Sequence, residues 1–360
     1  MNHRFVTLKA LETGIAASSV RTIELDMVDP ISQILIWHCT VMSGSVGSTE
    51  HPMLNIAKVE IIDGSDVLFS LDGQEMQALD IYHSGIYPRA GEFHYLNGLS
   101  ADFQIAIDFG RWLWDEELAF VPTNFRNPKL VITYAGTLVG NGAASCELRV
   151  NAALFDEKSI SPSGFLMTKE AKSWTVASGS HEYTECPKDF PYRKMLLQSR
   201  LASNDIRTIF SNVKLSSDQD KKVILNHTAW DILMGIGREN AYIEEMIQGA
   251  AGTALRNAHC TPTVGVTAPI AEFAAAIATT GVASMHYGGG YLRHISQAAT
   301  NVQLHVCGWG PHGCMQIPFG KQDEIADWFD VRQVGSLKLD VTSGNSSAVQ
   351  KLFIQQLRTY

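Results

Sequence analysis

The sequence predicts an all-β protein with two tandem domains, each a β-sandwich or a jelly roll. Two stretches resemble diverged copies of one another: a strand, a turn and a helix-prone run fill Val59–Leu79, and the same order recurs over Val213–Leu233. A second pair follows, Phe109–Phe120 and Phe319–Phe329, and each member begins with Phe-Gly. Because the pieces come in the same order in both halves, we interpret the chain as a duplicated β-domain.

The first half carries strand patterns at short intervals. We expect residues 1–19 to form an arm or a short helix outside the first barrel, which then occupies residues 20–155. Val20–Met27 alternates apolar with charged residues, the period of a half-buried strand, and Ile31–Met42 is a longer apolar run. Short strands separated by Asp-Gly and Asn-Pro turns are typical of sandwiches and jelly rolls. Further strands are predicted at Ile56–Ile62, Val67–Leu71, Phe103–Phe109, Leu130–Tyr134 and Cys146–Leu154.

A second set of strands lies beyond a predicted linker at residues 156–171, which contains Ser161-Pro-Ser-Gly164. Pro and Gly clusters of this kind mark connections rather than regular elements. The second barrel is therefore predicted over residues 172–360. Its strands are expected at Trp174–Ala177, Arg193–Arg200, Ile206–Leu215, Val223–Leu225, Val302–Cys307, Leu337–Val341 and Leu352–Leu357.

The second copy carries an insertion. The spacing from Val213 to Phe319 in the second copy is 56 residues longer than the spacing from Val59 to Phe109 in the first copy. The excess falls mostly between Met234 and His294. Asn240–Ile247 and Ile270–Ala278 are helix-prone. Since the first barrel joins the corresponding elements without such a segment, we expect the insertion to serve assembly rather than the second barrel's own core.

Composition narrows the function classes. Only 18% of the 360 residues are charged, against about 25% in an average soluble protein, and 45% are hydrophobic. This shortfall of charge predicts that much of the surface is covered by copies of the chain or by other partners. The net charge of −9 and the lack of basic tracts argue against general nucleic-acid binding.

Two further features bear on the compartment. The run Phe273–Leu292 has no formal charge, but its histidine and glycines argue against a membrane span. The six cysteines are mostly far apart, and the N-terminus lacks the profile of a signal peptide, so reduced thiols and folding in the cytosol are expected.

Two groups of residues have side chains of the types found in metal or catalytic sites, but neither group predicts such a site. His305, Cys307, His312 and Cys314 have the ligand types of zinc, but no C-x-x-C or H-x-x-x-H pair fixes a tetrahedron. We therefore expect no metal, and buried thiols beside a turn.

The acidic clusters Asp115–Glu117 and Asp323–Glu324 with Asp327 offer paired carboxylates of the kind that glycoside hydrolysis uses. Their recurrence in both halves favours instead a short helix whose N-terminus meets the acidic residues, with Trp112, Trp114 and Trp328 covering the barrel end. Nucleophile elbows and phosphate loops are absent from the sequence. No catalytic residue and no cofactor is expected.

The chain resembles the double jelly-roll major capsid proteins of tailless icosahedral viruses with internal membranes, the lineage that includes adenovirus hexon. The residues that carry the resemblance are Ile61–Ser65 leading to Gln74–Leu79, Phe109–Arg111 with Asp115, Phe125–Leu130 and Phe353–Tyr360.

This resemblance implies two tandem eight-stranded jelly rolls with short flanking helices and a long insertion in the second barrel. It implies a homotrimer that forms a pseudo-hexagonal capsomer in the virion of a bacteriophage or a related virus. Expected partners are neighbouring capsomers, minor capsid and vertex proteins and an internal viral membrane, without sequence-specific nucleic-acid binding. The alternative from a different class is a carbohydrate-active β-sandwich enzyme or lectin.

Overall fold

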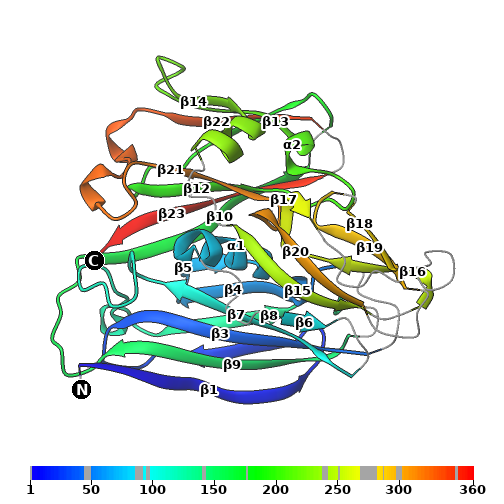
Figure 1. The fold of residues 1–360 in the computed structure, drawn as a ribbon. Coiled ribbons are helices and arrows are strands. Elements are labelled where there is room, and N and C mark those ends of the chain that lie inside the picture. Colours follow the sequence, from blue (N-terminus) through cyan, green and yellow to red (C-terminus); the bar gives the residue numbers. More distant parts are fainter. Residues whose placement is uncertain are drawn as a thin grey trace.

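The two halves of the chain repeat one arrangement of strands (Figure 1). The computed structural model describes residues 2–43, 50–85, 92–94, 98–139, 143–175, 177–236, 242–249, 252–267, 282–286, 288–296, 302–344 and 348–360. In the first half one sheet contains, in pairing order, β1 (His3–Ile15), β9 (Ala143–Phe155), β3 (Ile31–Met42) and β7 (Ser100–Asp108). The facing set is β2 (Val20–Glu24), β8 (Pro128–Tyr134), β4 (Ile56–Asp63) and β5 (Asp66–Leu71).

The second half contains the same two sets. One is β10 (Gly164–Thr175), β23 (Val349–Thr359), β12 (Tyr192–Gln198) and β21 (Cys314–Pro318). The other is β11 (His181–Glu185), β22 (Leu337–Ser343), β13 (Phe210–Ser217) and β14 (Lys222–Thr228). Strands that occupy the same place in both halves also come in the same order along the chain. The predicted duplication and the predicted double jelly roll are therefore confirmed.

The helix after the β4–β5 hairpin has a short counterpart after β13–β14. α1 (Gly73–Ser84) begins with a capping box, in which the Asp72 carboxylate accepts from the Glu75 backbone N–H and Glu75 accepts from the Asp72 N–H. Its C-cap is Gly85 at φ 67°, the left-handed conformation that glycine adopts without strain. The counterpart comprises α3 (Ala229–Asp231) and the π-helical turn η3 (Ile232–Ile236). The remaining short helices are η1 (Pro52–Asn55), η2 (Pro122–Asn124), α2 (Ile206–Ile209), η4 (Ile325–Asp327) and η5 (Val331–Gln333).

Each half has its own core between its two sets of strands. In β8, residues 130, 132 and 134 are buried in turn, as the two-residue period of a strand requires. The first core includes Ile36 and Phe103 from one sheet and Ile61 from the other. The second combines Met195 of β12 with Leu215 of β13.

The two halves share an extensive junction. β5 pairs in parallel with β10, so the strand sets of the two halves join into one eight-stranded sheet. Every residue of β12 is buried, because Met195 faces the second core while its neighbour Leu196 belongs to the first. A strand covered on both faces has a continuous buried pattern rather than an alternating one.

The described part of the inserted segment forms strands, and the first of the two expected helices is wrong. β15 (Ile243–Gly249) occupies most of the predicted helix Asn240–Ile247, and Ile270–Ala278 lies outside the described residues. β15 pairs with β6 (Glu92–His94) of the first half and with β20 (Val302–Pro311). The other strands of this region are β16 (Gly252–His259), β17 (Pro262–Thr267), β18 (Val282–His286) and β19 (Tyr291–Ser296).

The insertion also contributes to the cores. Ile247, Ala258 and Cys260 belong to the hydrophobic core of the first half, and Val264 to that of the second. This corrects the expectation that the segment serves assembly rather than the second barrel's own core, because Val264 is buried in that core.

Three further expectations need correction. Residues 3–15 are β1, which pairs with β9, and not an arm or a helix. The predicted linker ends inside β10, which starts at Gly164. Residues 302–307, expected as a strand of the second barrel, belong to β20, which lies between β15 and β17 in the sheet of the first half. In the second half, β21 takes the place that β7 has in the first. The apolar patterns show that strands exist but do not show which strand each one pairs with.

Among the described residues no helix is both long enough and apolar enough to cross a membrane. Part of the uncharged run Phe273–Leu292 lies outside them.

Candidate functional site

The first acidic cluster is held by an arginine. Arg111 forms a bidentate pair with Asp115, with Nε–Oδ2 at 2.7 Å and Nη2–Oδ1 at 2.9 Å, and also contacts Glu117. Burial of Asp115 works against its ionisation, but the hydrogen bonds from Arg111 and the Glu117 N–H, together with the Arg111 charge, outweigh burial and lower the pKa of Asp115. A general acid needs the opposite shift, so this carboxylate is suited to an ion pair and not to proton transfer.

The second acidic cluster lies next to the first. Arg111 Nη1 donates to the backbone carbonyl of Asp323 at 2.8 Å, and Glu324 forms an exposed pair with Lys321. Residues 110–117 form turns and bends instead of the expected helix, and the only helical turn of the second segment is η4. Asp115 and Glu117 are therefore held by Arg111, and Glu324 is held by Lys321.

The three tryptophans of these segments have different environments. Trp328 is buried and donates through Nε1 to the Lys321 carbonyl at 3.0 Å. Trp114 packs against Phe155 with ring centroids 5.5 Å apart. Only Trp112 is widely exposed, with the Arg111 guanidinium 4.4 Å from its ring centroid. These three tryptophans therefore do not form a row of exposed rings on which a sugar chain could stack.

The four residues with side chains of the zinc-ligand types do not come together as one site; they are His305, Cys307, His312 and Cys314. His312 and Cys314 are buried at the junction of the two halves, whereas His305 and Cys307 lie on the outer face of β20. Burial raises the pKa of the Cys314 thiol well above its usual value. All six cysteines are free and buried.

His312 takes part in a polar network between the two halves. Arg200 Nη1 lies 2.8 Å from His312 Nδ1, and His312 Nε2 lies 2.7 Å from Gln77 Oε1. Because a guanidinium can only donate, Nδ1 must accept, and Nε2 then carries the proton that is donated to Gln77. The ring of His51 lies 4.5 Å from that of His312, and its Nδ1 accepts from the Met53 N–H.

Both buried histidines are therefore neutral in the folded chain. Burial, followed by the nearby Arg200 charge, lowers the pKa of His312 well below its usual value. Burial is also the main cause of the lowered pKa of His51, to which His312 and Arg200 add. These groups stabilise the junction as hydrogen-bonding partners, and protonation would place like charges beside a guanidinium.

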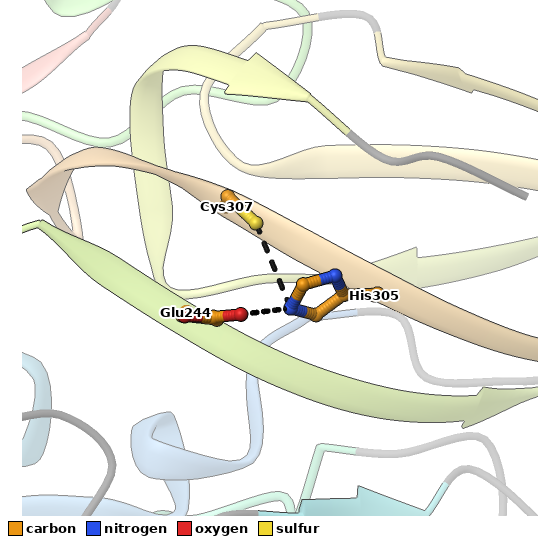
Figure 2. Close-up of side chains that lie close together, drawn as sticks. All are labelled: Glu244, His305 and Cys307. Carbon is orange, nitrogen blue, oxygen red and sulfur yellow. Dashed lines mark hydrogen bonds and ion pairs between the residues drawn. The ribbon is translucent and has the colours of Figure 1, made fainter.

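Strand register brings together another cluster, separate from the two acidic clusters, which consists of Glu244, His305 and Cys307 (Figure 2). In the β15–β20 pair Glu244 lies opposite Cys307, and His305 is two residues before Cys307 on the same face. Cross-strand neighbours have Cβ atoms about 4.5–5.5 Å apart, and diagonal ones remain within reach of long side chains. His305 Nε2 lies 2.5 Å from Glu244 Oε1 and 3.7 Å from Cys307 Sγ.

This cluster does not have the geometry of a catalytic triad. A triad uses both ring nitrogens of the histidine, one toward the nucleophile and one toward the carboxylate. Here the carboxylate and the thiol both approach Nε2, as Figure 2 shows. The three donor atoms converge on one place and are not arranged as a relay.

Sequence reasoning found His305 and Cys307 but missed Glu244. Nothing in the local pattern of Glu244-Glu245 distinguishes the two carboxylates, and the chain segment between β15 and β20 separates Glu244 from its partners. Only the pairing of the strands shows that Glu244 points outward, while Glu245 is buried and accepts from the Thr261 N–H at 2.8 Å.

Comparison with solved structures gives matches along nearly the whole chain. STIV MCP, from Sulfolobus Turreted Icosahedral Virus, matches with a TM-score of 0.61 at 12% identity, over 98% of this chain and 96% of that chain. PBCV-1 VP54 matches with a TM-score of 0.58 at 10% identity, over 99% and 94%. The major capsid protein P2 from Bacteriophage PM2 matches with a TM-score of 0.55 at 11% identity, over 99% and 98%.

No protein-family model and no curated protein matches the sequence. At identities of 10–12% the structural likeness establishes the fold, and it does so from one end of the chain to the other. The chain has the double jelly-roll fold of viral major capsid proteins.

Proposed function

We propose that this chain is the major capsid protein of an icosahedral virus and that three copies form a pseudo-hexagonal capsomer. The observation that carries the proposal is the likeness of the whole chain, including both jelly rolls and their junction, to capsid proteins of three viruses. Two equivalent rolls in each subunit become six in a trimer, and six equivalent rolls suit a hexagonal position in a shell.

The surface supports an assembling subunit. Several large apolar side chains are exposed on the single chain, among them Phe5, Val28, Trp112 and Tyr183, which are 49–76% exposed. Exposed aromatic and aliphatic groups combined with few charges are typical of surfaces that become covered. The net charge of −9 supports contact with other proteins rather than with nucleic acid.

The proposed partners follow from this role: neighbouring capsomers, minor capsid and vertex proteins, and a membrane beneath the shell. The location is the virion, after folding in the host cytoplasm, and six free buried thiols are compatible with such a compartment. A structural role also agrees with the ion-paired state of Asp115.

Light scattering and negative-stain imaging of the purified full chain test the proposal. We expect a mass of three chains at micromolar concentration and particles of hexagonal outline. A stable monomer would contradict the capsomer. A monomer that also binds or cleaves a glycan would support the carbohydrate-active alternative, for which the described residues give no favouring observation.

A further inference from the structure

We propose that Glu244, His305 and Cys307 bind a borderline divalent transition metal ion, with Zn²⁺ as the chemical type. The three residues supply a carboxylate oxygen, an imidazole nitrogen and a sulfur, and the three atoms all lie within 4.8 Å of one another. Among the described residues, these three side chains form a group whose possible ligand atoms are close enough together to share one ion. The proposal is independent of the capsid role.

The distances agree with a tetrahedral ion after a small movement. Zinc bonds to nitrogen and oxygen are about 2.0–2.2 Å long and bonds to sulfur about 2.3 Å, so ligand atoms in a tetrahedron lie roughly 3.3–3.7 Å apart. Cys307 Sγ and His305 Nε2 already have this separation, at 3.7 Å. The carboxylate of Glu244 is 2.5 Å from Nε2 and must withdraw by about 1 Å, which its 58% exposed side chain leaves it free to do.

The sheet fixes two of the three ligands. His305 and Cys307 are alternate residues of β20, so the pleat directs both side chains to the same face. β20 is paired on both sides, with β15 and with β17, and its backbone therefore cannot move far. Preorganised ligands reduce the ordering cost of binding.

The surroundings are open on one side and apolar on the other. Trp309 continues the same face of β20, and its ring packs against Tyr242 with centroids 5.0 Å apart. His305 is 37% exposed, so an ion can enter from solvent, and a water molecule can complete its shell.

The donor set selects the class of ion. Ca²⁺ and Mg²⁺ require oxygen ligands, whereas thiolate with imidazole favours zinc and its neighbours. Co²⁺ is the useful probe, because a cobalt–thiolate bond gives a charge-transfer absorption that a carboxylate or an imidazole does not give.

The test uses the full chain, stripped with a chelator under reducing conditions and titrated with Co²⁺ and then with Zn²⁺. We expect one ion per chain and a thiolate-to-cobalt band that zinc abolishes. Cys307→Ser should remove the band, and His305→Ala and Glu244→Gln should each weaken binding by about tenfold or more. Zinc should also protect Cys307 from alkylation, as read by peptide mass spectrometry.

A matched control is present in the same chain. His181 and Asp340 form another exposed cross-strand pair, 2.8 Å apart, which includes no cysteine. His181→Ala should leave the stoichiometry and the cobalt spectrum unchanged, and circular dichroism should show that each variant is folded. Absence of a thiolate band, or equal binding by folded Cys307→Ser protein, would overturn the proposal and leave an ordinary histidine–glutamate ion pair.

Discussion

Arg111 of the first half donates a hydrogen bond to the backbone carbonyl of Asp323 in the second half, at 2.8 Å. The two residues lie in the paired segments that begin with Phe109-Gly110 and Phe319-Gly320. The segments that most clearly reveal the duplication thus contact each other. The same guanidinium holds Asp115, so one side chain links the acidic clusters of both halves.

Replacement of Arg111 should be strongly destabilising. Arg111→Ala leaves the Asp115 carboxylate, which is 1% exposed, without its cation, and removing one partner of a buried pair costs about 3–5 kcal/mol. The control is Lys321→Ala, which removes an exposed pair with Glu324 and should cost about 1 kcal/mol or less. Urea unfolding of both variants measures the difference, and equal losses would contradict the structural role of Arg111.

The buried histidines should make stability depend on pH. The pKa values of His51 and His312 are lowered in the folded chain, so the unfolded chain binds more protons below its histidine pKa of about 6.5. The free energy of unfolding therefore keeps the full contribution of these histidines above pH 6.5. It falls as the pH drops below 6.5, by up to about 1.4 kcal/mol per pH unit for each histidine.

The variant His312→Asn isolates this effect. His312 has a φ of 51°, and asparagine tolerates this left-handed conformation but does not titrate. We expect the variant to be less stable at neutral pH but to have a smaller loss of stability between pH 7 and pH 5. Thermal unfolding across this range gives the slopes, and a slope as steep as that of the unmodified chain would exclude His312 as the source.

The cap of α1 can be tested by two substitutions with different expected costs. Asp72→Ala removes the side chain that accepts from the Glu75 N–H, and loss of an N-cap costs about 0.5–2 kcal/mol. Burial, and then the charge of Asp72, raise the pKa of Glu75 well above its usual value. Glu75→Gln should consequently cost less than Asp72→Ala, since its amide oxygen can still accept from the Asp72 N–H. Chemical denaturation of the two variants gives the order, and a larger loss for Glu75→Gln would be evidence for an ionised Glu75.

The inserted segment should contribute to the stability of the subunit itself. Ile247 of β15 is fully buried in the first core, and Ile→Ala changes of this kind cost about 2–5 kcal/mol. Val223→Ala, at a 50% exposed position of β14, is the matched control and should have little effect. Differential scanning calorimetry compares them, and an unchanged Tm for Ile247→Ala would contradict a contribution of this strand to the stability of the subunit.

Local patterns of the sequence determined many of the strands and the duplication. The run Ile31–Met42 has the bounds of β3, and the alternation in Val20–Met27 marks β2, because a strand's two-residue period depends only on which face is buried. The repeated order of hairpin, helix and Phe-Gly segment was sufficient to indicate two equivalent halves. Helix propensity failed at residues 243–247, where pairing with β6 and β20 makes the segment a strand.

Only the tertiary structure decided which residues meet across the chain. Glu244 joins His305 and Cys307 through the register of β15 on β20, and Gln77 joins His312 and Arg200 through the packing of the two halves. These contacts depend on strand pairing between distant segments, which no local period encodes. The sequence by itself determined two β-domains and their order, and its family resemblance implied that both are jelly rolls. Long-range packing decided how they join and where their polar side chains converge.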